Sequence, residues 1–154
     1  MSERGARIYA LLSQVRPVVL SSARVVDTQT RSLGWTVGSR AVMEVLEAQG
    51  PLTVPRIASR LSLARQNVQR HVDELLRLGD VRVTTNPAHR RSVLIQATSQ
   101  GAERFRSLHA RELADLADLV PGCSDQDVRT ATEVLRALGD DIRRRAHPDH
   151  PGVG

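Results

Sequence analysis

The sequence predicts a mainly helical fold with one small β-hairpin. Most apolar residues recur at spacings of three and four, which is typical of amphipathic helices. Two short segments rich in β-branched residues, 81–85 and 92–97, flank a turn that contains Pro87, as in a hairpin. Phe, Tyr and Trp occur once each, so the core must be built from aliphatic side chains. A length of 154 residues fits a single domain, which we expect to span residues 1–154.

The N-terminal third of the chain predicts two helices. Residues 3–31 have apolar side chains at helical spacing, which indicates a long first helix. Pro17 lies inside this segment, and proline removes a backbone donor and clashes with the preceding turn. We therefore expect a kink or a break near Arg16. Residues 33–35 are expected to form a loop, and residues 39–49 a second helix followed by a Gly-Pro stop.

The middle of the chain predicts two helices joined by a short turn. Thr53 can cap a helix over residues 55–60, whose proline falls in the first turn, where it is tolerated. A stronger helical pattern then runs to Leu78 and is stopped by Gly79. Its apolar positions fall on one face: Val68, Val72, Leu75 and Leu76. The rest of this helix is polar and faces outward: Arg65, Gln66, Asn67, Gln69, Arg70 and Asp73.

Two further helices follow the hairpin. One begins at Thr98 and ends before Pro121, and the last begins after Ser124, which can cap it. The apolar residues of the last helix form a seam: Val128, Ala131, Leu135, Leu138 and Ile142. Such a seam packs along another helix, either the preceding helix or one from a second copy of the chain. We expect Arg143–Arg145 to fray and residues 147–154 to form a flexible tail.

The positive charge is concentrated in one segment. The chain has 22 Arg, no Lys and 17 acids, so its net charge is 22 − 17 = +5. Residues 52–97 contain eight Arg and three acids, a net charge of +5, so the other residues sum to zero. A basic segment in a neutral scaffold is typical of a module that binds a polyanion, although an ordinary solvated surface is the alternative. The scarcity of aromatic residues argues against base stacking on single strands.

A helix, a short turn, a second helix and a basic-tipped hairpin, in this order, predict a winged helix-turn-helix over residues 36–97. In that arrangement the second helix lies in the DNA major groove, and the hairpin, or wing, follows the backbone or enters the minor groove. The residues of this region also resemble the MarR family of bacterial transcription regulators. The resemblance rests on LTVPRIASRL at 52–61, RQNVQRHVDEL at 65–75, Leu78-Gly79, Asn86-Pro87, Arg90-Arg91 and Thr98-x-x-Gly101.

The resemblance implies a cytoplasmic homodimer that acts on DNA in the bacterial nucleoid. Its helical dimerisation region would comprise residues 3–33 and 98–146, on either side of the DNA-binding region. Dimer symmetry implies an inverted-repeat operator with half-sites about 10 base pairs apart. Family members are commonly repressors that respond to small aromatic ligands or to oxidants. Duplex DNA, a second copy and a small aromatic effector are therefore the implied partners.

The residue types in this region suit duplex DNA. Amide side chains pair with adenine and guanidinium groups with guanine, so we expect base contacts from Gln66, Asn67, Gln69 and Arg70. We expect phosphate contacts from Arg56, Arg60, Arg65 and Arg82. At the wing we expect DNA contacts from His89, Arg90 and Arg91. The alternative for each set is a solvated polar surface or an unused flexible tip.

Two positions depart from the family pattern. His89 stands where the family usually has an aspartate that orients the wing arginines. Ala64 stands where a Ser, Thr or Asp commonly caps the recognition helix, and alanine cannot accept a hydrogen bond from the first-turn amides. Those amides are then free to face a phosphate.

We expect further roles for residues outside the winged region. The predicted dimerisation residues are Ile8, Leu12, Val128, Leu135, Leu138 and Ile142. Tyr9, Arg16 and Trp35 are candidates for an effector pocket, with packing or surface roles as the alternative. Cys123 is either a redox sensor or an inert thiol.

Other functional classes find little support in the sequence. No phosphate-binding loop, nucleophile elbow or Cys/His cluster is present, so we expect no enzyme, no cofactor and no bound metal. His147, Asp149 and His150 could chelate a metal, but a frayed tail offers no fixed geometry. No apolar stretch is long enough to cross a membrane, and one cysteine fits a reducing cytoplasm. The competing functions are a winged helix that binds protein and a non-specific architectural DNA-binding protein.

Overall fold

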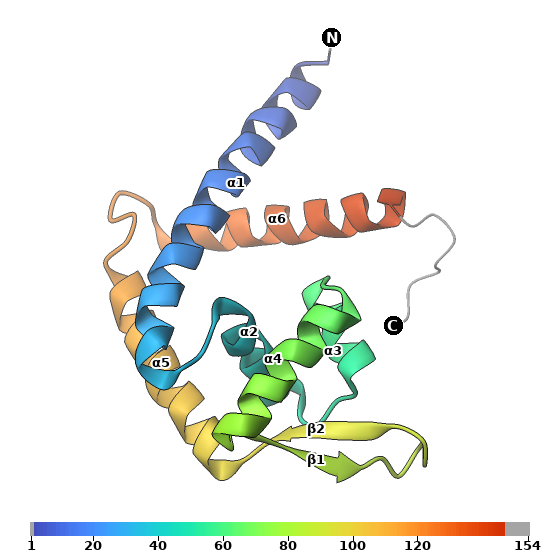
Figure 1. Cartoon of the computed structure of the whole chain (residues 1–154). Coiled ribbons are helices and arrows are strands. Elements are labelled where there is room, and N and C mark those ends of the chain that lie inside the picture. Colours follow the sequence, from blue (N-terminus) through green and yellow to red (C-terminus); the bar gives the residue numbers. More distant parts are fainter. Residues whose placement is uncertain (1, 147–154) are drawn as a thin grey trace. The chain divides into compact units, whose positions relative to one another are not determined.

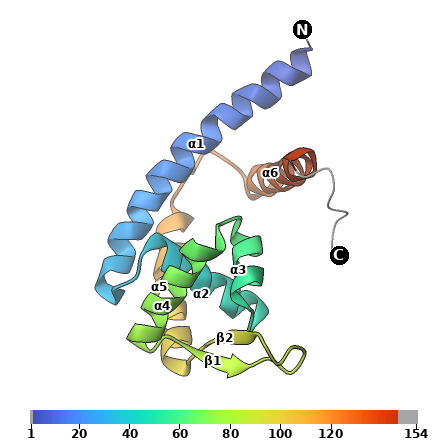
Figure 2. The ribbon, with the colours of Figure 1, turned by 45° about the vertical axis from the view of Figure 1, so that its right-hand side comes forward.

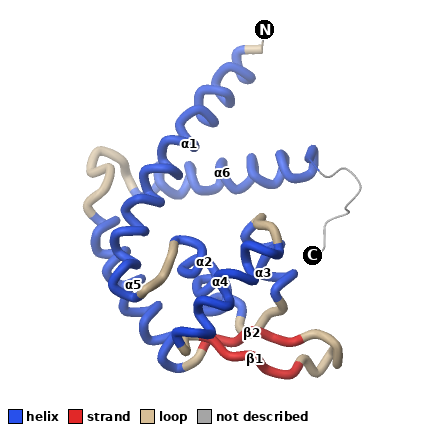
Figure 3. Tube along the Cα trace, viewed as in Figure 1, coloured by secondary structure: helices blue, strands red, loops and turns tan. Residues whose placement is uncertain are grey.

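The structure is a computed structural model of the chain that describes residues 2–146. Its elements, shown in Figures 1 and 3, are α1 (Glu3–Thr30), the 3₁₀ helix η1 (Arg31–Leu33), α2 (Val37–Gln49), α3 (Val54–Leu61), α4 (Arg65–Leu78), β1 (Val81–Thr85), β2 (Val93–Ala97), α5 (Ser99–Ala117) and α6 (Asp125–Ala146). The fold is mainly helical with one antiparallel hairpin, which confirms the predicted fold class. The predicted flexible tail, residues 147–154 with His147, Asp149 and His150, lies outside the described residues.

The chain divides into two compact units between Glu112 and Leu113, within α5. The first unit contains α1 to β2 and most of α5. The second contains the end of α5 and α6. The single domain expected over residues 1–154 stays a prediction.

Local capping signals in the sequence correspond to real helix starts. Thr53 Oγ1 accepts a hydrogen bond from the Arg56 amide at 3.4 Å and so caps α3. Ser124 Oγ accepts from the Asp127 amide at 3.1 Å, and the Asp127 carboxylate accepts from the Ser124 amide at 2.8 Å. This reciprocal pair is a capping box, which begins α6 where the sequence predicted.

Two local predictions differ from the structure. α1 is one continuous helix (Figure 2) and includes Pro17, so the break expected near Arg16 is wrong, and a kink there stays a prediction. A proline removes a single hydrogen bond, and a helix of 28 residues keeps the others. Arg143–Arg145 belong to α6 instead of fraying, because the first two of these arginines pair with Asp140 and Asp141 one turn earlier.

The core of the first unit lies between α2, α3, α4 and the hairpin. Its fully buried apolar side chains include Val42, Met43, Ile57, Val68, Val72, Leu75 and Ile95. Leu52 joins the hairpin through a β-bridge, with amide–carbonyl bonds of 3.1 and 2.8 Å to Ile95. In the hairpin, Val81 lies opposite Ala97 and Thr85 opposite Val93. Because one face of α4 packs in this core, the opposite face is left for other contacts.

A buried carboxylate lies where the chain passes from α4 to β1. Asp80 is fully buried and accepts hydrogen bonds from Trp35 Nε1 at 2.8 Å, Gln100 Nε2 at 3.1 Å and Arg104 Nη1 at 2.6 Å. Arg104 also donates to the Leu33 carbonyl and lies 5.5 Å from the centre of the Trp35 ring. An unpaired buried carboxylate would be strongly destabilising, so these donors are what permit Asp80 to be buried.

The start of α5 packs directly on this point. A Cβ atom on Gly101 would lie 2.0 Å from the Asp80 carbonyl oxygen, so the position requires glycine. The Thr98 amide donates to the Asp80 carbonyl at 3.0 Å, and the Thr98 hydroxyl donates to the Gly79 carbonyl at 2.7 Å. The Thr98-x-x-Gly101 motif thus attaches α5 to the end of α4.

A second ion pair joins α2 to α5. Arg40 Nε donates to Glu112 Oε1 at 2.6 Å, and Arg40 also pairs with Glu44. His109 Nδ1 lies 3.3 Å from Glu112 Oε2. Burial alone would raise the pKa of Glu112, but hydrogen bonds and charge from Arg40, with a smaller effect of His109, hold that pKa below its ordinary value of 4.5.

We expect Arg104→Met to lower the free energy of unfolding by about 3–5 kcal/mol, because it leaves the Asp80 charge buried without its cation. Urea unfolding at one protein concentration measures the loss. Arg106→Met is the matched control, since Arg106 lies on the same helix and its ion pairs are more exposed. The control should lose less than about 1 kcal/mol. Equal losses in the two variants would contradict the structural role given to Asp80.

We expect the contribution of Glu112 to stability to depend on pH. The folded-state pKa is lowered, so the stabilisation is present above the unfolded value of 4.5 and is lost as pH falls through the lower folded value. Glu112→Gln should therefore be less stable than the parent near neutral pH, and this difference should shrink in acid. Urea unfolding across the acid range tests this, with Glu103→Gln as the exposed control. A difference independent of pH would count against the charged Arg40–Glu112 pair.

Candidate nucleic-acid interface

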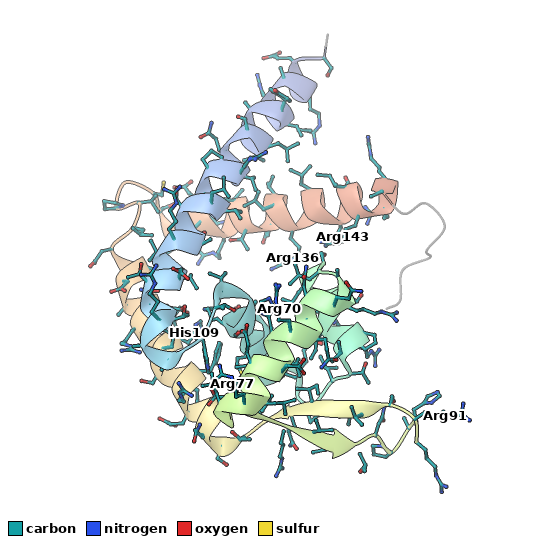
Figure 4. The ribbon with its side chains drawn as sticks, viewed as in Figure 1. Arg70, Arg77, Arg91, His109, Arg136 and Arg143 are labelled. Carbon is teal, nitrogen blue, oxygen red and sulfur yellow. The ribbon has the colours of Figure 1, made fainter. Side chains whose placement is uncertain are left out.

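The outward face of α4 is a row of exposed polar side chains. Gln66, Arg70, Asp73 and Arg77 follow one another at spacings of four, three and four, opposite the buried apolar face of the helix. Asn67 and Gln69 flank this row and are also exposed. Figure 4 shows Arg70 and Arg77 on α4. The structure therefore exposes all four residues predicted to contact bases on a single helix.

Most of these side chains are free to bind a ligand. Gln69 Nε2 donates to Asp73 Oδ1 at 2.9 Å, so these two are joined along the helix. Within residues 2–146, the side chains of Gln66, Asn67 and Arg70 make no hydrogen bond or ion pair. Unpaired amide and guanidinium groups are those that form bidentate pairs with adenine and guanine.

Arg77 is a further candidate contact residue that was not predicted from the sequence. It lies on the same row as Arg70, is exposed, and has no acidic partner in the part of the chain that the structure describes. Its spacing of seven from Arg70 was the available signal, because residues seven apart share a helix face. Recognition helices contact bases mainly with their N-terminal residues, so the position of Arg77 near the C-terminus suits a phosphate contact.

The N-terminus of α4 has no side-chain cap. Ala64 occupies the cap position and makes no side-chain hydrogen bond, as the sequence predicted. The Asn67 and Val68 amides bond to the Ala64 carbonyl at 3.0 and 3.2 Å. The amides of Arg65 and Gln66 have no acceptor among the described residues. Two open amides at the positive end of a helix dipole favour an anion such as a phosphate.

The arginines predicted to contact phosphates lie on three elements. Arg56 and Arg60 are exposed on α3, and Arg65 is exposed at the first position of α4. Arg82 on β1 donates from Nε and Nη2 to Gln96 Oε1 on β2, at 3.2 and 3.0 Å. This cross-strand contact holds Arg82 on the hairpin, whereas the other three guanidinium groups are unpaired within the described chain.

The hairpin has an exposed basic tip. His89, Arg90 and Arg91 are exposed between β1 and β2, and Figure 4 shows Arg91 at the far end of the hairpin. Across the described residues, no acidic side chain pairs with Arg90 or Arg91. Among the described residues, no acidic side chain therefore replaces the aspartate that the family resemblance led us to expect. Both arginines are available to a ligand.

The predicted dimerisation residues are exposed or half-buried on two helices. In the first unit, Ile8 is half-buried and Leu12 is exposed on α1. In the second unit, α6 presents its predicted seam, of which Leu138 is half-buried and the others are exposed: Val128, Leu135 and Ile142. Exposed apolar rows of this kind suit packing on another helix, and their role in a dimer stays a prediction.

The predicted effector residues are not brought together within one chain. Tyr9 is 76% exposed on α1, and Arg16 is exposed on the same helix. Trp35 is buried against Asp80, and its amide bonds to the Thr30 carbonyl at 3.3 Å. Tyr9 precedes Thr30 by 30 − 9 = 21 residues of α1, roughly 30 Å of helix. The structure gives Trp35 a packing role, and an effector pocket stays a prediction.

The thiol, the possible metal ligands and His71 are not among the predicted DNA contacts. Cys123 is an exposed free thiol. In the described chain no helix has the length and apolar character of a membrane span, and no three metal-ligating side chains form a group. His71 on α4 packs on Gly38, where a Cβ atom would lie 2.1 Å from the imidazole Nε2. His71 is therefore a packing residue of the interface between α2 and α4.

Comparison with known sequences finds relatives over nearly the whole chain. A family model described as the MarR family matches residues 36–92. An uncharacterized protein of Mycobacterium tuberculosis is 30% identical over 147 residues, which cover 94% of this chain and 93% of that protein. YkoM of Bacillus subtilis, named an uncharacterized HTH-type transcriptional regulator, is 26% identical over 137 residues, covering 89% and 87% of the two chains.

Solved structures of MarR-family proteins also match most of the chain. A crystal structure of a MarR family transcription regulator matches with a TM-score of 0.80 and 29% identity, over 93% of this chain and 95% of that one. Wild-type MarR from Escherichia coli, in the apo form, matches with a TM-score of 0.71 and 22% identity, over 83% and 96%. The second match shows a shared fold.

We expect two arginines on the same row of α4 to differ in their effect on DNA binding. Arg70→Ala should weaken binding to the preferred duplex by about 1–3 kcal/mol and relax the preference at one base pair, because its bidentate guanine contact is lost. Arg77→Ala should weaken binding to all duplexes alike and make the salt dependence shallower, because it removes a phosphate contact.

Fluorescence anisotropy with a preferred and a scrambled duplex measures both effects. Arg111→Ala is the control, since Arg111 is an exposed arginine on α5, outside the winged region. Equal losses of affinity on the two duplexes for Arg70→Ala would remove Arg70 from the base contacts.

Proposed function

The chain belongs to the MarR family of winged-helix transcription regulators, and from this premise we propose that it binds duplex DNA as a homodimer and recognises an inverted repeat. Each chain would place α4 in a major groove and its hairpin beside the same half-site. Dimer symmetry would then set the half-sites about 10 base pairs apart.

The observation that best supports this proposal is the first half of α4. Gln66, Asn67 and Arg70 are exposed and unpaired within the described residues, and two open amides lie at the start of the helix. The amides can hold a phosphate while the side chains reach the base edges. A surface that served solubility alone would not require this combination of an uncapped helix start and unpaired bidentate groups.

Exposed apolar side chains on α1 and α6 support a homodimer. On α1, Leu12 and Val19 lie seven residues apart on one helix face and are exposed to 37% and 56%, and on α6, Leu135 and Ile142, also seven apart, are exposed to 44% and 46%. Soluble monomers rarely expose continuous apolar rows of this kind. A second copy offers the same rows and therefore a self-complementary surface, as a two-fold dimer requires.

We further propose that the dimer acts as a repressor in the bacterial nucleoid and that a small aromatic effector releases it. Membership of a family whose members commonly act in this way supports the proposal. Tyr9, Arg16 and Trp35 lie apart in one chain, so an effector pocket that used Tyr9 with Trp35 would need a second copy.

Selection from a pool of random duplexes at two salt concentrations tests the function. We expect enrichment of an inverted repeat and a steep loss of affinity with salt, because phosphate contacts release counterions. Tight binding without enrichment would indicate an architectural DNA-binding protein. Weak binding without enrichment would favour a protein partner and would contradict the proposal.

The same assay tests the dimer. Leu135→Glu puts a charge in the apolar row of α6 and should produce a monomer in sedimentation, with a loss of about 100-fold or more on the inverted repeat. Ala137→Glu is the matched control, because Ala137 is exposed about half a turn away on α6. A dimer that survives Leu135→Glu, with unchanged affinity, would exclude this face from the dimer interface.

A further inference from the structure

We propose that Asn86 and Ser92 are positioning residues of the wing, which fix its tip loop so that Arg90 and Arg91 are held ready for duplex DNA. This inference rests on the proposed function. It assigns a role to two residues that were not among the predicted contacts, in the loop where His89 stands in place of the expected aspartate.

The loop between β1 and β2 is closed by side-chain hydrogen bonds at its two ends. Asn86 Nδ2 donates to Ser92 Oγ at 2.8 Å, which joins the first residue of the loop to its last. Ser92 Oγ in turn donates to the His89 carbonyl at 3.3 Å, at the middle of the loop. Asn86 Oδ1 accepts from the Ala88 amide at 3.1 Å. The two side chains thus span the whole loop with one connected set of bonds.

Backbone bonds complete this arrangement. The His89 amide donates to the Asn86 carbonyl and the Ser92 amide to the His89 carbonyl, each at 3.2 Å. Two consecutive turns therefore share His89, and Asn86 adds an Asx turn across Pro87, whose ring restricts the backbone further. Arg90 and Arg91 lie inside the second turn, so the same bonds define their backbone.

Burial separates the residues that hold the loop from those that can meet a ligand. Asn86 and Ser92 are half-buried, whereas His89, Arg90 and Arg91 are exposed. No side chain in the described structure pairs with either arginine, so nothing else orients them. In this chain the Asn86 side-chain amide and the Ser92 hydroxyl fix the backbone of the loop. This backbone orients the arginines, as an acidic side chain would do by pairing with one of them.

The physical consequence concerns the entropy of binding. A flexible loop must be ordered when it meets DNA, and the cost of that ordering is subtracted from the affinity. A loop that is already ordered avoids this cost, and its arginines remain unpaired. An arginine paired with an acid would have to exchange that partner for a phosphate. The arrangement therefore favours tight electrostatic contact without direct participation of Asn86 or Ser92.

A double-mutant cycle on the full chain tests the inference. We expect Asn86→Ala and Ser92→Ala each to weaken binding to the selected inverted repeat by about threefold to tenfold with an unchanged salt dependence, because the same phosphate contacts form after a larger ordering cost. Ser92→Thr keeps the hydroxyl and should restore binding. In the background of Arg90→Ala with Arg91→Ala, Asn86→Ala should have no further effect, because Asn86 acts through those arginines.

Thr85→Ala is the matched control, because Thr85 is exposed beside Asn86 and its side chain makes no hydrogen bond in the described chain. Its affinity should equal that of the parent. A second readout needs no DNA: exchange of the Ala88 amide hydrogen should be about twofold to tenfold faster in Asn86→Ala.

The outcomes separate this inference from the proposed function. If the parent binds the repeat and Asn86→Ala binds equally well, the inference is wrong and the function stands. If Asn86→Ala costs the same with and without the two arginines, Asn86 contacts DNA itself and is not a positioning residue. If the parent binds no duplex, the proposed function fails and the inference fails with it.

Discussion

The burial of Asp80 is the constraint on which the winged region depends. A carboxylate without solvent is tolerated only with donors around it, and its three donor side chains come from two places in the chain: Trp35 after η1, and Gln100 and Arg104 on α5. Asp80 itself lies between α4 and β1. One buried charge therefore fixes the end of the recognition helix, the base of the wing and the start of α5 relative to one another.

The buried polar groups are hydrogen-bonded within the chain, and this explains why the polar groups on the outer surface are available for binding. Among the described residues, every buried side-chain nitrogen or oxygen has a hydrogen-bond partner. Polar groups that would otherwise compete for the ligand are paired inside, as in the Arg40–Glu112 pair. Within the winged region, unpaired groups lie on α3, on the outer face of α4, at its uncapped start and at the tip of the wing. Rigid support beneath exposed, unpaired side chains such as Gln66, Asn67 and Arg70 is what a surface that reads DNA needs.

The local features of the fold could be predicted from the sequence, and the long-range features could not. The bounds of α4 follow from an apolar face and the stop at Gly79, and the hairpin follows from its β-branched strands. Asp80 and Trp35 are 45 residues apart, and no periodic pattern connects them. Asp80 therefore counted as one acid in a basic segment, and Trp35 as a candidate for a ligand pocket.

The same distinction holds within the candidate site. Gln66, Asn67 and Arg70 were predicted because helical spacing alone determines which side of α4 they occupy. Arg77 shares that side and could have been found in the same way. Asn86 and Ser92 could not, because loop hydrogen bonds depend on a backbone path that composition does not determine. The predictions at Pro17 and Arg143–Arg145 failed for a different reason. Local rules for proline and for chain ends predicted a break and fraying, but both long helices continue through these residues.

Hydrogen–deuterium exchange of the full chain, with and without a duplex that contains its selected repeat, tests the central claim most directly. If α4 and the wing form the DNA-binding face, the duplex should slow exchange at the open amides of Arg65 and Gln66 and in the tip loop of residues 86–92. The backbone amides of Asp80 and Thr98, which are hydrogen-bonded where α4, β1 and α5 meet, should exchange slowly in both states. Protection confined to α1 or α6, with no change in α4 or the wing, would contradict this assignment of the interface.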